Sequence, residues 1–194
     1  MLDTHGRKYV NPIIESGANT FIKLNLTPNN VTVLALILGV LTSVFVYFNM
    51  EIIGVILLWM SGYLDAVDGA MARKTNKTSS FGTLMDITFD RIVEVSIILV
   101  IGFRHIDIRM NLIILAISII LSMTIFLTVG ALTQQKGMKS FYYQAGIAER
   151  SEGFIMFSLM ILLPSYLSII TNIFSIMILI TAFQRALEAK KILD

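Results

Sequence analysis

Long uncharged, apolar runs alternate with short polar segments along most of the chain. A membrane-spanning helix needs roughly 20 predominantly apolar residues, and apolar runs lie near residues 31–49, 52–65, 84–103 and 111–132. Of these, 52–65 ends at Asp65, and 84–103 also contains Asp86, Asp90, Arg91 and Glu94. The uncharged stretch 153–184 is too long for one helix, and Pro164-Ser165-Tyr166 would turn the chain within it. We therefore expect two more spans at about 147–163 and 167–187, which makes six in all.

The segment before the first span has a different pattern. In residues 3–24, apolar side chains such as Ile13 and Phe21 recur at helical spacing among charged residues. This pattern predicts an amphipathic helix on the membrane surface, which Asn11-Pro12 is expected to interrupt in its first turn. Thr27-Pro28 then supplies an N-cap and a proline at the first helical position of the next helix.

Composition supports an integral membrane protein. The 194 residues are 56% hydrophobic and 14% charged, against roughly 25% charged residues in a soluble domain. The absence of cysteine excludes disulfides and thiolate metal sites. We expect one all-α domain over 1–194, with an interfacial helix at 1–25 and a six-helix membrane core at 26–194. A soluble, fully buried helical core is the alternative.

Basic residues are distributed unevenly between the two sides that six spans would define. The side with both termini would hold Arg7, Lys8, Lys23, Arg73, Lys74, Lys77, Lys136, Lys139, Arg150, Arg185, Lys190 and Lys191. The opposite loops would hold Arg104 and Arg109. Because basic loops stay in the cytoplasm, we expect a multi-pass protein of the cell (cytoplasmic) membrane, with both termini and the active site facing the cytoplasm.

Aspartates gather at the cytoplasmic ends of the second and third spans. Asp65 and Asp68 are three residues apart, and Asp86 and Asp90 are four apart, so each pair shares one face of its helix. The loop between them is short, so we expect the two helices to be antiparallel neighbours that bring the four carboxylates together. Carboxylates inside predicted spans are costly and are functional candidates by default.

Four clustered carboxylates would repel one another strongly. Arg73 and Arg91 would offset part of this repulsion, and hard divalent cations such as Mg²⁺ or Mn²⁺ would offset the rest. Gly69 and Ala72 are small enough to let a phosphate approach closely. The residues thus indicate a two-metal site for a phosphate ester or diphosphate. Structural polar contacts between helices are the alternative.

The spacing of these residues also resembles a known family. The pattern D-x2-D-G-x2-A-R-x8-G-x3-D-x3-D runs from Asp65 to Asp90, and it matches the signature of class I CDP-alcohol phosphatidyltransferases. Leu26-Thr27-Pro28-Asn29 is similar to the segment before the first span in that family. The segment 145–150 and Arg185 resemble its phosphatidylinositol-phosphate synthase branch.

The resemblance implies the transfer of a phosphatidyl-type group from a CDP-activated lipid to a small alcohol, with release of CMP. It also implies two Mg²⁺ or Mn²⁺ ions held by Asp65, Asp68, Asp86 and Asp90, with Asp90 also acting as general base. The CDP-lipid would contact Pro28, Asn29, Asn30, Val31, Gly69, Arg73 and Ser79. The partners implied are the CDP-lipid, the alcohol, membrane lipids and a second copy in a homodimer, and no nucleic acid.

Recognition of the acceptor is less clearly encoded. Arg150 and Arg185 match basic residues that bind the acceptor phosphate in the inositol-phosphate branch, whereas Gly130-Ala131-Leu132 occupies the region of an expected lysine. Lys136 or Lys139 is a candidate substitute, although loop lysines are usually only solvated. We expect the acceptor to be a small polyol or its phosphate.

Two other functions are compatible with parts of the pattern. A membrane prenyltransferase also binds a diphosphate through metal-bridged aspartates, although usually with two separate aspartate motifs. A divalent-cation transporter would use intramembrane carboxylates, but nearer the midplane than these aspartates are expected to lie.

Glu94 follows Asp90 by one turn, and a pair with Arg91 or a plain interhelical hydrogen bond would explain it.

Overall fold

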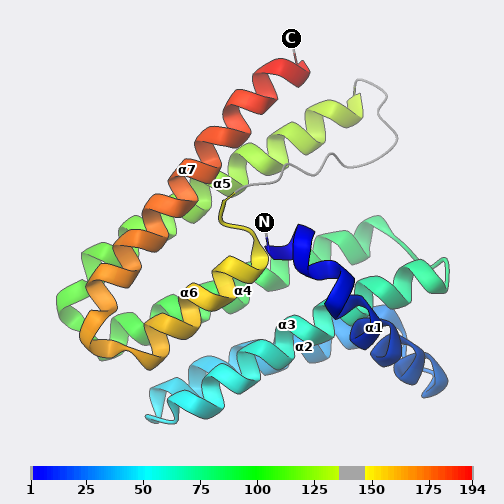
Figure 1. Cartoon of the computed structure of the whole chain (residues 1–194), viewed down its shortest axis with the longest axis horizontal. Helices are drawn as coiled ribbons and strands as arrows, with labels where there is room; N and C mark the ends of the chain where they lie inside the picture. The colour runs from blue at the N-terminus through cyan, green and yellow to red at the C-terminus, as the bar shows by residue number, and fades with distance from the viewer. Residues whose placement is uncertain (1, 136–146, 194) are drawn as a thin grey trace. The chain divides into compact units, whose positions relative to one another are not determined.

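The computed structural model describes residues 2–135 and 147–193, and these residues form helices without any β-strand. Figure 1 shows the order along the chain. The elements are α1 (Leu2–Lys23), α2 (Pro28–Tyr47), α3 (Glu51–Lys74), α4 (Ser80–Arg104), η1 (Ile106–Ile108), α5 (Arg109–Gln135), α6 (Arg150–Leu162), η2 (Pro164–Tyr166) and α7 (Leu167–Leu193). The prediction of an all-α protein is confirmed.

The chain divides into two compact units. One comprises His5–Ile106 and therefore α1 to α4, and the other comprises Asp107–Asp194 together with Met1–Thr4. Each unit is described below by itself. The prediction of a single domain over 1–194 stays a prediction.

In the first unit, α2 packs against both α3 and α4, whereas α3 and α4 make little direct backbone contact with each other. Ser61 of α3 donates its hydroxyl to the Ala35 carbonyl of α2 at 2.7 Å. The hydroxyls of Ser43 in α2 and Ser96 in α4 form a hydrogen bond of 2.7 Å. Since lipid offers no hydrophobic drive for helix association, small and polar residues specify these contacts.

Arg104, the last residue of α4, joins the ends of three helices. Its guanidinium donates to the Val46 carbonyl at 2.7 Å, to Asn49 Oδ1 at 2.6 Å and to Glu51 Oε1 at 2.9 Å. Asn49 adopts a left-handed conformation with φ of 59°, which lets α2 end and α3 begin within a few residues. Arg104 therefore fixes the ends of α2, α3 and α4 to one another.

Helix α1 packs on the end of α3. Ala18 is fully buried against Val31, Val67 and Met71, which are also fully buried. The Tyr63 hydroxyl donates to the Ile13 carbonyl at 3.2 Å. This packing covers part of the apolar face of α1, whereas Val10 and Ile13 stay exposed. The expected position of α1 on the membrane surface stays a prediction.

Lys74, in the last turn of α3, also joins α3 to α1. It forms an ion pair with Glu15 and donates to Asn19 Oδ1 at 2.8 Å. The expected interruption at Asn11-Pro12 is wrong, because α1 continues through Pro12. Pro12 is exposed, and as a proline it donates no hydrogen bond within the helix.

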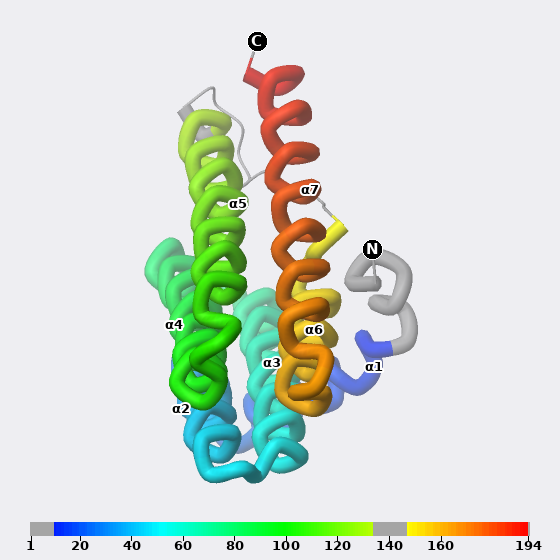
Figure 2. Tube along the Cα trace, turned by 90° about the vertical axis from the view of Figure 1, so that its left-hand side faces the viewer, coloured from blue at the N-terminus to red at the C-terminus, as the bar shows by residue number. Residues whose placement is uncertain are grey.

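In the second unit, α5 runs beside α7, as Figures 1 and 2 both show. Asn111 donates to Asn172 Oδ1 at 2.7 Å and so joins the start of α5 to α7. Helix α6 is connected to α7 by η2, which includes the turn expected at Pro164. Phe157 of α6 packs edge to face on Phe174 of α7, with 5.2 Å between the ring centres.

Within residues 2–135 and 147–193, four segments are long and apolar enough to cross a membrane: Pro28–Tyr47, Glu51–Lys74, Ile106–Thr133 and Pro164–Leu193. The chain is thus a multi-pass membrane protein. The other two expected spans are helices, α4 and α6, that do not meet the same measure. Helix α4 carries Asp86, Asp90, Arg91, Glu94 and Arg104, and α6 has 13 residues.

Replacing Arg104 with methionine is expected to lower the free energy of unfolding by about 2 kcal/mol, because hydrogen bonds to a charged group are lost and the carbonyl and carboxylate partners are left behind. The free energy of unfolding of Arg104→Lys should lie between the values of wild type and Arg104→Met, since lysine keeps the charge but not the forked geometry of the guanidinium. Denaturant unfolding in detergent would measure both. Lys190→Met, at an exposed lysine of α7, is the charge-matched control, and an equal loss there would contradict the role of Arg104.

Candidate metal and phosphate site

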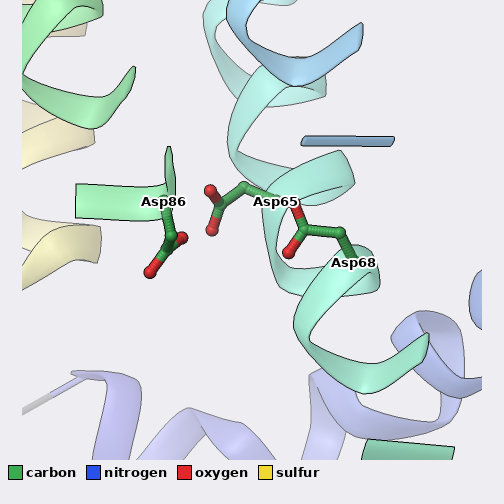
Figure 3. A group of neighbouring side chains, drawn as sticks. All are labelled: Asp65, Asp68 and Asp86. Atoms are coloured by element: carbon green, nitrogen blue, oxygen red, sulfur yellow. The ribbon is translucent and has the colours of Figure 1, made fainter. Parts of the chain in front are cut away.

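Asp65 and Asp68 lie on the buried face of α3, with 8% and 6% of their surfaces exposed. This face also carries Leu58 and Ser61, which follow the helical repeat of three and four residues. Asp86 of α4 is half-buried and lies opposite them. In Figure 3, Asp65 and Asp68 extend from α3 and Asp86 extends from α4, on either side of a common space.

One carboxylate oxygen from each of Asp65, Asp68 and Asp86 lies within 4.8 Å of the others. Three acidic groups at this spacing repel one another in a poorly solvated position. Mg²⁺ and Mn²⁺ prefer carboxylate oxygens completed by water and substrate phosphate. The donor set thus fits a hard divalent cation, and three of the four carboxylates that were expected to meet, Asp65, Asp68 and Asp86, do so.

Asp90 is not part of this group of three. It lies one turn further along α4 and is half-buried. Arg91 forms an ion pair with Glu94, so the pairing that was one of two expectations for Glu94 is present. The roles of Asp90 as a metal ligand and as a base stay predictions.

The first turn of α4 is shaped by Ser79 and Gly82. The Ser79 hydroxyl accepts a hydrogen bond from the Gly82 N–H at 3.0 Å, as an N-cap does. A Cβ atom at Gly82 would lie 3.2 Å from Ser79 Oγ and 3.6 Å from Asn29 Oδ1. The start of α4 therefore lies against the start of α2, and Ser79 and Asn29, both expected to contact the CDP-lipid, lie close together.

The start of α2 follows the sequence prediction. Thr27 caps the helix by accepting from the Asn30 N–H at 3.3 Å, and Pro28 occupies the first turn. Asn29 and Asn30 are exposed, whereas Pro28 is buried and Val31 is fully buried in the core beside α1. The Val31 side chain is therefore occupied by packing, while the two asparagines are accessible.

Gly69 and Arg73 lie one turn apart on α3. A Cβ at Gly69 would lie 3.4 Å from Arg73 Nη1, so the Arg73 side chain extends back over Gly69 along the helix. This direction points the exposed guanidinium toward the turn that carries Asp68. The structure thus brings together one part of the expected diphosphate contacts.

In the second unit, Arg185 of α7 is 8% exposed. It donates to Ser122 Oγ of α5 at 3.1 Å, and its guanidinium carbon lies 4.9 Å from the centre of the Phe126 ring. Ser122 and Phe126 were not singled out from the sequence, since a serine and a phenylalanine in an apolar helix carry no recognisable pattern. A buried arginine at this position needs such partners.

Arg150 begins α6, and its guanidinium carbon lies 5.8 Å from the centre of the Phe154 ring. The preceding segment is tied to α7 because the Ala148 N–H donates to Thr181 Oγ1 at 2.9 Å. Lys136 and Lys139, the other expected acceptor contacts, lie outside the residues that the structure describes.

The fold and site together define a helical, multi-pass membrane protein in which three neighbouring carboxylates are suited to bind a divalent metal and, through it, a phosphate substrate. The sequence profile of the CDP-alcohol phosphatidyltransferase family matches residues 25–185, and the chain belongs to this family. It is therefore an enzyme of phospholipid biosynthesis that transfers a phosphatidyl-type group from a CDP-activated lipid to an alcohol. This match favours the phosphatidyltransferase over the prenyltransferase and transporter alternatives.

The chain is similar to relatives from archaea and bacteria. It is 37% identical to an archaetidylinositol phosphate synthase of Pyrococcus horikoshii, over 47% of this chain and 49% of that protein. It is 34% identical to a phosphatidylinositol phosphate synthase of Corynebacterium glutamicum, over 48% of this chain and 43% of that protein. It thus spans about half the length of each of these two relatives. An uncharacterised protein of Aquifex aeolicus is 30% identical over 97% of this chain and 94% of its own length.

Solved structures share the fold. A crystal structure of Mycobacterium tuberculosis phosphatidylinositol phosphate synthase with bound CDP-DAG superposes with a TM-score of 0.71 at 24% identity, over 92% of this chain and 94% of that one. The same enzyme in complex with manganese and citrate gives a TM-score of 0.71 at 23% identity, over 91% and 88% of the two chains.

Removing one carboxylate from the group of three is expected to weaken divalent-metal binding. Asp65→Asn and Asp86→Asn should each raise the dissociation constant for Mn²⁺ by about tenfold or more, because a neutral amide replaces a charged ligand. Electron paramagnetic resonance of free Mn²⁺ over purified protein would measure this. Asp107→Asn, at an exposed carboxylate in η1, is the matched control. Unchanged affinity in both site variants would show that the metal binds elsewhere.

Proposed function

We propose that this protein joins the phosphatidyl group of a CDP-activated lipid to a phosphorylated polyol, at a site held by Asp65, Asp68 and Asp86. The observation that carries this proposal is the meeting of three carboxylate oxygens from two helices within 4.8 Å. Its support from outside the chain is the family to which the chain belongs.

The three aspartates would hold two divalent ions, Mg²⁺ or Mn²⁺, together with Asp90. Bound there, the ions would neutralise negative charge on the diphosphate and on the departing CMP. The relative crystallised with manganese supports this choice of metal. The carboxylates themselves supply a fixed ligand set, since their helices are held by α2 on one side and by Arg104 at the far end.

The donor would lie along the first turns of α2 and α4. Asn29 and Asn30 are exposed there, and Ser79 lies beside Asn29 across Gly82. Asn29, Asn30 and Ser79 would bind the nucleotide end of the donor, together with Pro28 and the backbone of Val31. Gly69 leaves room for the diphosphate, and Arg73 would pair with one of its oxygens. The relative crystallised with CDP-DAG supports a donor of this chemistry.

In the reaction, the acceptor hydroxyl oxygen attacks the phosphorus atom that carries the lipid. The bond from this phosphorus to the bridging oxygen breaks, and CMP leaves with that oxygen. Asp90 would take the proton of the attacking hydroxyl, since it lies one turn beyond Asp86 on the same helix. The products are the phosphodiester lipid and CMP.

Arg185 and Arg150 would bind the phosphate of the acceptor. Arg185 is buried, yet the Ser122 contact and the Phe126 ring hold its guanidinium in place, and a pre-oriented guanidinium recognises phosphate with two hydrogen bonds. Relatives named as synthases of inositol phosphate lipids support an inositol phosphate as the first acceptor to test. Lys136 and Lys139 remain candidates for the same role.

For the membrane arrangement, we propose six spans, with α4 and α6 added to the four long apolar segments. Apart from Arg104 at its end, the charged residues of α4 lie between Asp86 and Glu94, and Leu99 and Phe103 further along the helix are exposed to the surroundings. Helix α1 would lie on the cytoplasmic surface, with exposed Val10 and Ile13 toward lipid. We further propose that the termini face the cytoplasm, because most basic residues would lie on their side of the membrane. We also propose that the protein forms a homodimer, as the family resemblance implies.

The proposed reaction is tested by incubating purified protein with CDP-diacylglycerol, Mg²⁺ or Mn²⁺ and a panel of polyols and polyol phosphates, and measuring CMP. Asp90→Asn should reduce CMP release by about a hundredfold or more, the usual contribution of a general base. Binding of CDP-diacylglycerol to this variant should stay within about twofold of wild type. Near-normal turnover by Asp90→Asn would remove the assigned base. No CMP with any acceptor would contradict the proposed function.

Arg185→Gln should raise the KM for a phosphorylated acceptor by about tenfold to a hundredfold, because a charge-assisted hydrogen bond to phosphate is lost. The KM for CDP-diacylglycerol should not change. Steady-state kinetics with each substrate varied in turn would measure both values. Lys190→Gln, at an exposed residue of the same helix, is the matched control, and an equal change in both KM values would assign Arg185 to folding instead.

A further inference from the structure

Gly39 of α2 lies against both α3 and α4. A Cβ atom at Gly39 would lie 2.3 Å and 2.9 Å from the two methyl groups of Val93 in α4, and 2.9 Å from Ser61 Oγ in α3. Gly39, Ser61 and Val93 are all buried. No side chain other than hydrogen fits between these two residues unless the Val93 or Ser61 side chain, or the helix that carries it, shifts.

The residues that touch Gly39 share helix faces with the carboxylates. Ser61 precedes Asp65 by four residues, and Val93 follows Asp86 by seven. At 1.5 Å of rise per residue, these separations are about 6 Å and about 10 Å along the helix axes. A shift of α3 or α4 at Gly39 would therefore reach the carboxylates with little loss, because a helix moves as a stiff rod over such a length.

The two helices have few other restraints at this level. They make little direct backbone contact with each other, and α2 is held to them by the bond from Ser61 to the Ala35 carbonyl and by the pair Ser43 and Ser96. Near Gly39, the distance between α3 and α4 is thus set mainly by their two contacts with α2, whereas Arg104 joins α4 to α3 directly at the far end. Gly39 lies in both contacts.

We propose that Gly39 is a positioning residue that sets the distance between the carboxylates of α3 and the carboxylate of α4. This inference rests on the proposed metal-binding role of Asp65, Asp68 and Asp86. A small divalent ion tolerates little variation in its metal–oxygen distances, and functional groups need to be held within about 0.5 Å of their working positions. The absence of a side chain at position 39 thus sets the distance between the metal-binding carboxylates, although Gly39 itself does not contact the ion.

The test measures Mn²⁺ binding directly, by electron paramagnetic resonance of free Mn²⁺ over purified protein in detergent. Gly39→Ala should raise the dissociation constant by about tenfold, because the added methyl group displaces Val93 and its helix. Val93→Ala should stay within about threefold of wild type. The double variant Gly39→Ala/Val93→Ala should return to within about threefold of wild type, since it removes both methyl groups that the new Cβ would meet. The one close contact left is with Ser61 Oγ, the end of a short side chain that can shift.

Gly54→Ala is the matched control. A Cβ at Gly54 would meet Val46 Cγ2 at 2.7 Å and the Thr42 carbonyl oxygen at 3.2 Å, so it disturbs the contact of α3 with α2 alone. Gly54 precedes Asp65 by eleven residues, or about 16 Å. This variant should lose stability in thermal unfolding as Gly39→Ala does, yet bind Mn²⁺ within about twofold of wild type.

The inference is overturned if Gly39→Ala binds Mn²⁺ as wild type does, if Val93→Ala does not rescue it, or if Gly54→Ala weakens binding equally. If Gly39→Ala alone does not fold, the double variant decides, and weak binding or misfolding there also overturns the inference. Mn²⁺ binding that depends on Asp65 and Asp86 but not on Gly39 would refute this inference alone. Binding that does not depend on the two aspartates would refute the metal site itself.

Discussion

The mutual repulsion of Asp65, Asp68 and Asp86 is the constraint on which the rest of the first unit depends. Two of these carboxylates are more than nine-tenths buried, and oxygens of all three lie within 4.8 Å of one another. Such a group separates its two helices unless other contacts hold them or a cation neutralises it. The contacts around α3 and α4 keep the two helices together against this repulsion.

The restraints on α4 are distributed along its whole length. Ser79 caps its first turn beside Asn29, Ser96 bonds to Ser43 near its middle, and Arg104 joins its last turn to α2 and α3. Helix α3 is held in addition by α1, through the Lys74 contacts at the end that carries the acidic residues. The carboxylates are therefore fixed by contacts on several sides, and the metal is not needed to define where they lie.

Much of the site was predictable because its residues follow one another along two helices. The spacing of Asp65 and Asp68 places both on one face of any α-helix, and the short turn before Ser79 returns the chain to the same end of the unit. Periodicity could not reveal that α2 lies against both helices, since this depends on tertiary packing at Gly39. It also failed at Pro12, where an exposed position tolerates the lost hydrogen bond, and it gave no sign of the partners of Arg185.

Small and polar residues supply contacts in both units beside the apolar packing, and the surrounding lipid explains their importance. Apolar side chains gain little by leaving lipid for another apolar surface, so packing of leucine and isoleucine cannot select one arrangement of helices. Gly39 and Gly54 instead allow close approach, and the serine pair and Arg104 give direction and register. In the second unit, Arg185 uses Ser122 and Phe126 in the same way. The same few polar residues thus specify the fold and orient the charged groups, so a substitution that alters helix packing here is expected to alter chemistry as well.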